Sequence, residues 1–172
     1  DGIELLRVAR YTTTLMALAT IAVVAALGRR LYGPMGGLLA ALTLSVVPLH
    51  VRFSHLAASD IPSALWSSLA VLWAVRIVQD DRRRDVIIAG VFVGLAASTK
   101  YPGLFAAIPV AMAVLLARRT SWHLLTAGGA AVLALACTSP FLWLSPAEAW
   151  ADISAMGAEH LASDAHQANS NP

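Results

Sequence analysis

The chain has 172 residues, of which 58% are hydrophobic and only 13% are charged, and its mean hydropathy is +0.70. Soluble domains are usually about 45–50% apolar and about 25% charged. The net charge is only +2, and the arginines gather in clusters between apolar segments. Composition therefore excludes an ordinary soluble domain, a disordered chain and a nucleic-acid-binding module, and it predicts an all-α, polytopic membrane protein.

The cysteine content and the chain ends limit the interpretation further. Cys137 is the single cysteine, which excludes a disulfide within the chain and a zinc site built from cysteines. The chain begins at Asp1 without a signal peptide and ends in the polar run 164–172. From these features we expect an internal piece of a larger protein.

Apolar segments divide the chain into candidate membrane spans. A span needs about 20 apolar residues, at a rise of about 1.5 Å each. The sequence predicts six spans in a bundle formed by residues 1–144, at about 11–27, 35–51, 62–78, 86–99, 103–117 and 124–144. Residues 145–172 are predicted to form an extracytoplasmic interfacial helix, at about 146–162, and a polar tail. The motif Ser-Pro-Ala-Glu at 145–148 favours a helix start there.

The division of the apolar run 86–117 into two spans depends on a turn. As one helix this run would be roughly 48 Å long, whereas the hydrocarbon core is about 30 Å thick. Lys100-Tyr101-Pro102-Gly103 lies in its middle. Pro102 disfavours a helical Tyr101 and removes a backbone donor, so we expect a sharp turn between two short helices.

The distribution of arginine supports this count. Loops 28–34, 79–85 and 118–122 carry most of the arginines. With six spans all three loops lie on one side, which the positive-inside rule makes cytoplasmic, and they bind anionic lipid at most. The opposite, extracytoplasmic side then holds residues 52–61 and the turn at Lys100.

Small residues predict close helix packing. Gly90 and Gly94 form a GxxxG motif, and the pairs Gly36-Gly37 and Gly128-Gly129 begin other spans. Glycine lets helix backbones approach closely, so we expect helix contacts at all of these positions.

Ionisable side chains at the extracytoplasmic rim are the candidate functional residues, because such groups are costly in a membrane. We expect the outer turns of the two hairpins to meet in one cavity that holds Arg52, His55, Asp60 and Lys100, with Tyr101 beside it. Lys100 suits an anionic head group such as a phosphate, and its alternative role is to snorkel from a helix end. Asp60 can also cap the third span.

Arg52 and two histidines at the rim leave further alternatives open. Arg52 can snorkel to the interface or pair with Asp60. His50 and His55 are five residues apart with no obvious third ligand, so no metal site is predicted from them. No catalytic residue is identified from the residue pattern alone.

Two segments resemble protein O-mannosyltransferases. Ser54–Asp60 is similar to their Ser-Arg-x-x-x-x-Asp segment. Gly94–Phe105, which reads Gly-Leu-Ala-Ala-Ser-Thr-Lys-Tyr-Pro-Gly-Leu-Phe, closely resembles their Gly-Leu-x-x-Ser-x-Lys-[Tyr/Trp]-x-Gly-Leu-Phe segment. Gly28–Gly33 looks like the matching inner turn of the wider superfamily, the polytopic glycosyltransferases of the GT-C type.

The resemblance implies an inverting transfer of a mannose-like hexose from a polyprenyl-phosphate donor to a hydroxyl of a protein, lipid or glycan acceptor. The transfer would take place on the extracytoplasmic side. The Ala- and Arg-rich composition favours a bacterial inner membrane, and whether a divalent metal takes part is left open. By position, Lys100 would hold the lipid phosphate and Asp60 would be a structural or site-supporting acid. His55 stands where these enzymes usually have Arg.

The resemblance also implies that the catalytic Asp lies in a first outer loop, upstream of this chain. The chain alone is therefore expected to be inactive. The alternative function is a transporter or flippase of lipid-linked substrates, which would use the same rim charges as a binding site. A transporter should place charges near mid-membrane. A third interpretation is a non-catalytic membrane scaffold.

Overall fold

The structure, a computed structural model, describes residues 2–80, 82–118, 121–145, 147, 151, 154 and 155. In the described residues the regular structure is helical and no strand occurs, as the composition predicts. The chain divides into two compact units, residues 1–135 and 136–172. Three described helices are long and apolar enough to cross a membrane, namely Gly2–Val46, Asp60–Asp80 and Ser121–Thr138, and Tyr101–Leu116 is a shorter apolar helix.

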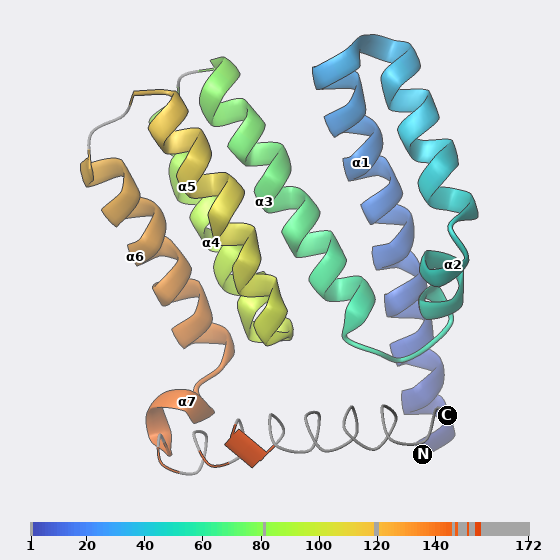
Figure 1. The fold of residues 1–172 in the computed structure, drawn as a ribbon. Coiled ribbons are helices and arrows are strands. Elements are labelled where there is room, and N and C mark those ends of the chain that lie inside the picture. The colour runs from blue at the N-terminus through green and yellow to red at the C-terminus, as the bar shows by residue number, and fades with distance from the viewer. Residues whose placement is uncertain are drawn as a thin grey trace, which may run out of the picture. The chain divides into compact units, whose positions relative to one another are not determined.

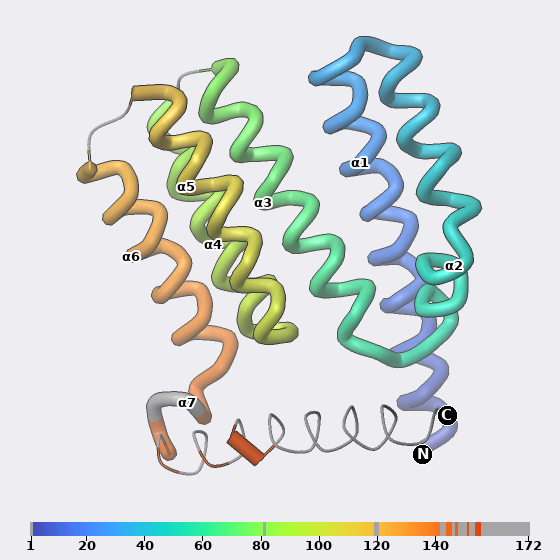
Figure 2. Tube along the Cα trace, in the orientation of Figure 1, coloured from blue at the N-terminus to red at the C-terminus, as the bar shows by residue number. Residues whose placement is uncertain are grey.

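Helix α1, Gly2–Val46, contains a sharp bend that separates two antiparallel arms (Figures 1 and 2). At the bend Gly33 has φ 78° and ψ −173°, and Pro34 follows. This backbone region is open essentially to glycine alone. The first arm extends well beyond the predicted span 11–27, because hydropathy marks only the apolar part of a helix and not the polar turns that continue it.

The second arm of α1 is shorter than the predicted span 35–51. The helix ends at Val46, Val47 is extended, and a separate short helix α2 covers Pro48–Ser54. Pro48 is the physical cause, because a proline disfavours the helical conformation of the residue before it. The hydroxyl of Thr14 donates to the Ser54 carbonyl at 3.0 Å and connects α2 to the first arm.

Helix α3, Asp60–Asp80, is the centre of the first unit and packs against α1, α4 and α5. Helix α4, Arg83–Thr99, is antiparallel to it, and both helices are longer than the predicted spans 62–78 and 86–99. The core of the unit consists of small and branched residues of α3, α4 and α5, with one residue from the short 3₁₀ helix before α5 and one from α6: Ala70, Ala74, Ile77, Val86, Ala89, Val93, Ala106, Val110, Ala113, Val114 and Ala127.

The predicted turn between the fourth and fifth spans is confirmed. Lys100 ends α4 in an extended conformation, and the Gly103 N–H donates to the Lys100 carbonyl at 2.8 Å. A 3₁₀ helix η1, Tyr101–Ala106, leads into α5, Ala107–Leu116. A Cβ on Gly103 would lie 2.2 Å from the Ala96 carbonyl oxygen, so the turn folds closely back onto α4.

Helix α6, Ser121–Thr138, is shorter than the predicted span 124–144 at its carboxyl end. Ser139 and Pro140 interrupt it, and a short helix α7 covers Phe141–Leu144. Proline again is the cause, because Pro140 has no backbone N–H to donate to a carbonyl of a continuing helix. The predicted interfacial helix at 146–162 lies almost entirely outside the described residues.

The predicted close packing is confirmed for the GxxxG motif. Added Cβ atoms on Gly90 and Gly94 would each lie 2.2 Å from a carbonyl oxygen of α6, that of Ala127 or of Ala131. Gly36 and Gly37 also lie against the first arm of α1. The prediction is wrong for the pair at 128–129, where an added Cβ would meet nothing within 4 Å.

Candidate functional site

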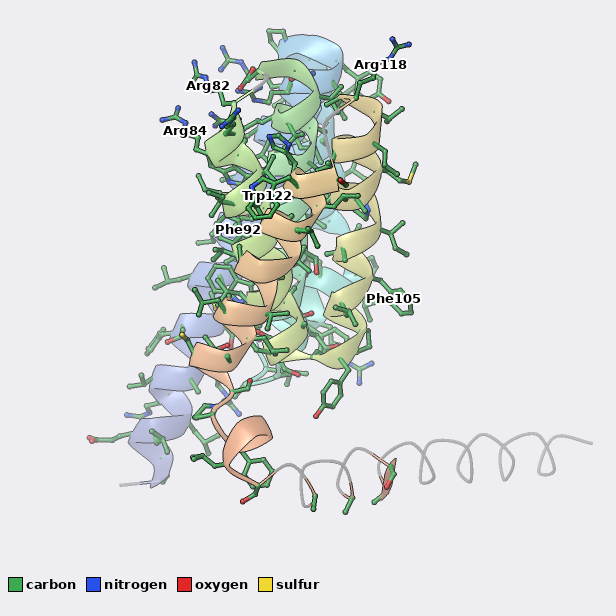
Figure 3. The ribbon with its side chains drawn as sticks, turned by 90° about the vertical axis from the view of Figure 1, so that its left-hand side faces the viewer. Arg82, Arg84, Phe92, Phe105, Arg118 and Trp122 are labelled. Carbon is green, nitrogen blue, oxygen red and sulfur yellow. The ribbon has the colours of Figure 1, made fainter. Side chains whose placement is uncertain are left out.

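The turns of the first unit gather at two opposite ends of its helices. The bend of α1 and the connection between α3 and α4 lie at one end, and α2 and the turn between α4 and η1 lie at the other (Figure 1). Arg82, Arg84 and Arg118 project at the first of these ends (Figure 3). We call the end with these arginines the arginine end and the opposite end the lysine end. The arrangement separates the arginine clusters from Lys100, as the charge pattern predicts.

Two predicted site residues meet at the lysine end. Lys100 Nζ donates to Asp60 Oδ1 at 2.7 Å. Their side chains are 46% and 36% exposed, so the pair is accessible from outside the bundle. Asp60 is the first residue of α3 and Lys100 directly follows α4, so the pair joins the two ends of one antiparallel hairpin.

Asp60 lies in the first turn of α3 instead of preceding the helix as a cap. The backbone N–H of Ser63 donates to the Ser59 carbonyl at 3.0 Å. A carboxylate in the first turn is stabilised by the positive end of the helix dipole. The Asp60 charge is therefore stabilised both by α3 and by the Lys100 ammonium.

The other predicted residues lie on neighbouring elements. Arg52 is in the last turn of α2 and His55 ends this helix, and both are exposed. Tyr101, the first residue of η1, is 52% exposed beside Lys100. The alternative in which Arg52 pairs with Asp60 is wrong, because Asp60 pairs with Lys100, and the described residues offer Arg52 no ion pair.

His50 is the buried polar residue of α2. It is only 8% exposed, and no described group forms a hydrogen bond with its Nε2. Within the described residues no group of three or more His, Cys, Asp and Glu side chains is placed to hold a metal ion. A cavity of about 140 Å³ lies between α4, α5 and α6, lined by apolar residues that include Gly90, Val110 and Ala127, and not by the predicted site residues.

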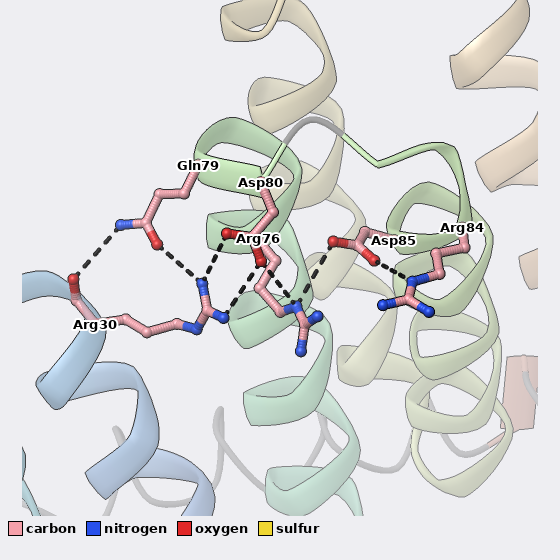
Figure 4. Close-up of polar contacts among 6 residues, drawn as sticks. All are labelled: Arg30, Arg76, Gln79, Asp80, Arg84 and Asp85. Carbon is pink, nitrogen blue, oxygen red and sulfur yellow. Dashed lines mark hydrogen bonds and ion pairs between the residues drawn. The ribbon is translucent and has the colours of Figure 1, made fainter.

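The arginine end holds a polar network that the sequence analysis missed. Arg30 of α1 pairs with Asp80 of α3 at 3.3 Å, and Arg76 Nε lies 3.4 Å from Asp80 and 3.6 Å from Asp85 of α4 (Figure 4). Arg84 Nε lies 3.7 Å from the other Asp85 oxygen. The network therefore connects α1, α3 and α4.

One sequence signal could have revealed part of this network. Arg76 lies inside the predicted span 62–78, and Asp80 follows it by the four residues that bring side chains together on a helix. An arginine inside an apolar span is itself a candidate for function or pairing. The contact with Asp85 could not be predicted, because it depends on how α4 folds back onto α3.

Comparison with known proteins assigns a family. The family model described as dolichyl-phosphate-mannose-protein mannosyltransferase matches residues 4–144. No curated protein and no solved structure matches this chain. The matched segment runs from the first turn of α1 to the end of α7 and therefore includes both members of the Asp60–Lys100 pair.

Proposed function

Since this chain belongs to the dolichyl-phosphate-mannose-protein mannosyltransferase family, we propose that the full-length protein transfers a mannose-like hexose from a polyprenyl-phosphate carrier to an acceptor hydroxyl. The family membership makes the protein a membrane glycosyltransferase of the mannosyltransferase type. The observation that carries the finer proposal is the exposed Lys100–Asp60 pair at the lysine end.

In the proposed reaction the bond between C1 of the sugar and the phosphate oxygen breaks as a bond from the acceptor oxygen to C1 forms. Attack from the opposite face inverts C1. The acceptor hydroxyl loses its proton to a carboxylate acting as general base. The polyprenyl phosphate leaves with the bonding electrons, so negative charge grows on its oxygens.

Lys100 is the residue that we propose for this developing charge. Its ammonium carries three donors and is already oriented by Asp60. A cation placed in advance at the leaving group stabilises the transition state more than the ground state. An exposed ion pair is worth only about 0–1 kcal/mol, so the ammonium can exchange Asp60 for a phosphate at small cost.

Asp60 supports Lys100 in this proposal and is not assigned as the general base. We propose that Tyr101, which follows Lys100 in the chain, and Arg52 and His55 at the end of α2 complete the donor surface. The base is the Asp of a first outer loop that the family resemblance implies, and we propose that residues 1–172 alone lack transfer activity. Protein, lipid and glycan hydroxyls remain the proposed acceptors.

The proposed location is an inner membrane of a bacterium, with the lysine end on the extracytoplasmic side and the arginine end on the cytoplasmic side. Supporting this orientation, the exposed loop residues Arg82, Arg84 and Arg118 lie at one end of the unit, and the turn that carries Lys100 lies at the other (Figures 1 and 3). Large apolar side chains such as Leu15, Leu42 and Leu116 are 54–70% exposed, as lipid-facing residues are.

The test uses the full-length protein in liposomes with a polyprenyl-phosphate mannose whose sugar carries a radioactive label. A transferase releases polyprenyl phosphate and moves the label to a hydroxyl acceptor. A flippase moves the intact lipid across the bilayer and releases no polyprenyl phosphate. Translocation without cleavage would replace the proposed function with the transport alternative, and neither activity would favour the scaffold.

A further inference from the structure

The α3–α4 hairpin carries an ion pair at each end, and the order of charges is reversed between them. At the lysine end the acid Asp60 is on α3 and the base Lys100 follows α4. At the arginine end the base Arg76 is on α3 and the acid Asp85 is on α4. At a rise of about 1.5 Å per residue, the two pairs are about 24 Å apart along α3 and about 22 Å apart along α4. The stretches of α3 and α4 between the two pairs therefore match in length. Sliding one helix along the other would separate both pairs.

The pair at the arginine end is the buried one. Asp85 is 0% exposed, and the Arg76 side chain is 21% exposed. Within the described part of the chain no hydrogen-bond donor reaches either Asp85 carboxylate oxygen. A buried carboxylate is costly unless a cation compensates it, so the helix register that brings Arg76 to Asp85 is strongly preferred.

Arg76 is held from two further directions. Its guanidinium lies 4.0 Å from the centre of the Trp73 ring, and Asp80, one turn along α3, pairs with its Nε. Asp80 is paired in turn with Arg30 of α1 (Figure 4). These contacts leave the Arg76 side chain little freedom to follow Asp85 if α4 shifts.

The apolar contact between α3 and α4 combines small and large residues. Ala70, Ala74 and Ala89 let the two helices approach closely, and the Trp66 and Phe92 rings stack between them with centroids 6.0 Å apart. This stacking lies between the two ion pairs, so the charges at the ends act together with it in selecting one register. A buried polar group that specifies one register is the best-attested role of such groups in helix pairs.

We infer that Arg76 and Asp85 are positioning residues, which determine the register of α4 against α3 and thereby place Lys100 Nζ at Asp60. The register itself is a property of the fold. Its consequence for sugar transfer rests on the proposed function.

Chemical cross-linking at the lysine end tests the register directly. In the full-length protein with Cys137→Ala, the reporter variant Asp60→Cys with Lys100→Cys is treated in native membranes with a short bifunctional thiol reagent. Asp85→Asn, which removes the charge at nearly constant volume, should slow cross-linking about fivefold to tenfold per folded molecule. Arg76→Gln should do the same, and combining both substitutions should slow it no further, because the two residues act as one pair.

Two matched variants separate register from general destabilisation. Arg84→Gln removes the exposed partner of Asp85, and Gly94→Ala disturbs the opposite packing of α4 on α6. Both should cross-link within about twofold of the parent, even where they lower thermal stability. Parent-like cross-linking in Asp85→Asn and Arg76→Gln would overturn the inference, as would equal slowing in Gly94→Ala.

Transfer activity then distinguishes the two proposals. With Asp60 and Lys100 intact, Asp85→Asn should lower kcat/KM about tenfold, and Arg84→Gln should not. If Lys100→Ala leaves transfer unchanged, the proposed function of the lysine fails, while slower cross-linking in Asp85→Asn still supports the positioning role.

Discussion

Lys100 Nζ lies 2.7 Å from Asp60 Oδ1, so that two residues 40 positions apart in the chain form one charged pair at the open end of a helical hairpin. Their side chains are 46% and 36% exposed, which limits the stabilisation that the pair gives the fold. The pair also joins the two segments that resemble protein O-mannosyltransferases, Ser54–Asp60 and Gly94–Phe105. Because the pair contributes little to stability, the Lys100 ammonium is suited to binding an anionic ligand.

Lys100→Ala should greatly lower transfer activity without unfolding the protein. We expect transfer from a polyprenyl-phosphate sugar to fall about a hundredfold, because the developing phosphate charge loses its cation. The free energy of unfolding should change by less than about 1 kcal/mol. Activity in liposomes and thermal unfolding in detergent measure the two effects. Lys100→Arg, which keeps the charge, is the control and should retain more activity than Lys100→Ala.

Asp60→Asn should lower transfer less than Lys100→Ala does, by about tenfold, because in our proposal Asp60 only orients the ammonium. In the double variant with Lys100→Ala, the Asp60 substitution should add almost nothing. A double-mutant cycle on kcat/KM measures this coupling. Additive losses would show that Asp60 acts on substrate independently of Lys100.

Gly94→Ala should destabilise the bundle by about 1–3 kcal/mol, because the new methyl group would lie 2.2 Å from the Ala131 carbonyl oxygen. Gly128→Ala is the matched control on a helix, since its Cβ meets nothing within 4 Å. It should stabilise by about 0.5–1 kcal/mol through helix propensity. Thermal unfolding in detergent compares them, and equal effects would contradict the packing of α4 on α6.

Substitution of Gly33 should destabilise the hairpin formed by the two arms of α1. With φ 78° and ψ −173°, both Gly33→Ala and Gly33→Asn should cost about 1–3 kcal/mol. A steric clash with neighbouring residues is not the cause of this destabilisation, because a Cβ on Gly33 would meet nothing within 4 Å. An ordinary left-handed turn would instead tolerate Asn much better than Ala, so a stable Asn variant would contradict this geometry.

Membrane orientation can be tested with single cysteines in a Cys137→Ala background. Tyr101→Cys lies beside the lysine end, and Arg118→Cys lies at the arginine end. In intact cells a membrane-impermeant maleimide should label the first and not the second until the cells are permeabilised. The expectation follows from the positive-inside rule. The reverse labelling pattern would place Lys100 in the cytoplasm and contradict the proposed donor side.

Much of this molecule follows from the amino-acid sequence by itself. Hydropathy and composition determine that the chain is a helical membrane protein, since both depend only on how much apolar surface each segment carries. Pro102 and Gly103 determine the turn after Lys100 through local backbone sterics. The same local rule explains where the prediction of helix ends was wrong: Pro48 and Pro140 interrupt apolar runs that hydropathy alone treats as continuous.

Only the tertiary structure decided which charges meet. Sequence placed Asp60 and Lys100 at one rim but left the partner of Asp60 open, and it did not reveal that Asp85 is buried against Arg76. Each contact depends on the register between two helices, which is set by packing and by the cost of burying an unpaired charge. The packing energy and the cost of burying a charge both depend on many residues that are distant in the chain. A local sequence pattern therefore does not reveal them.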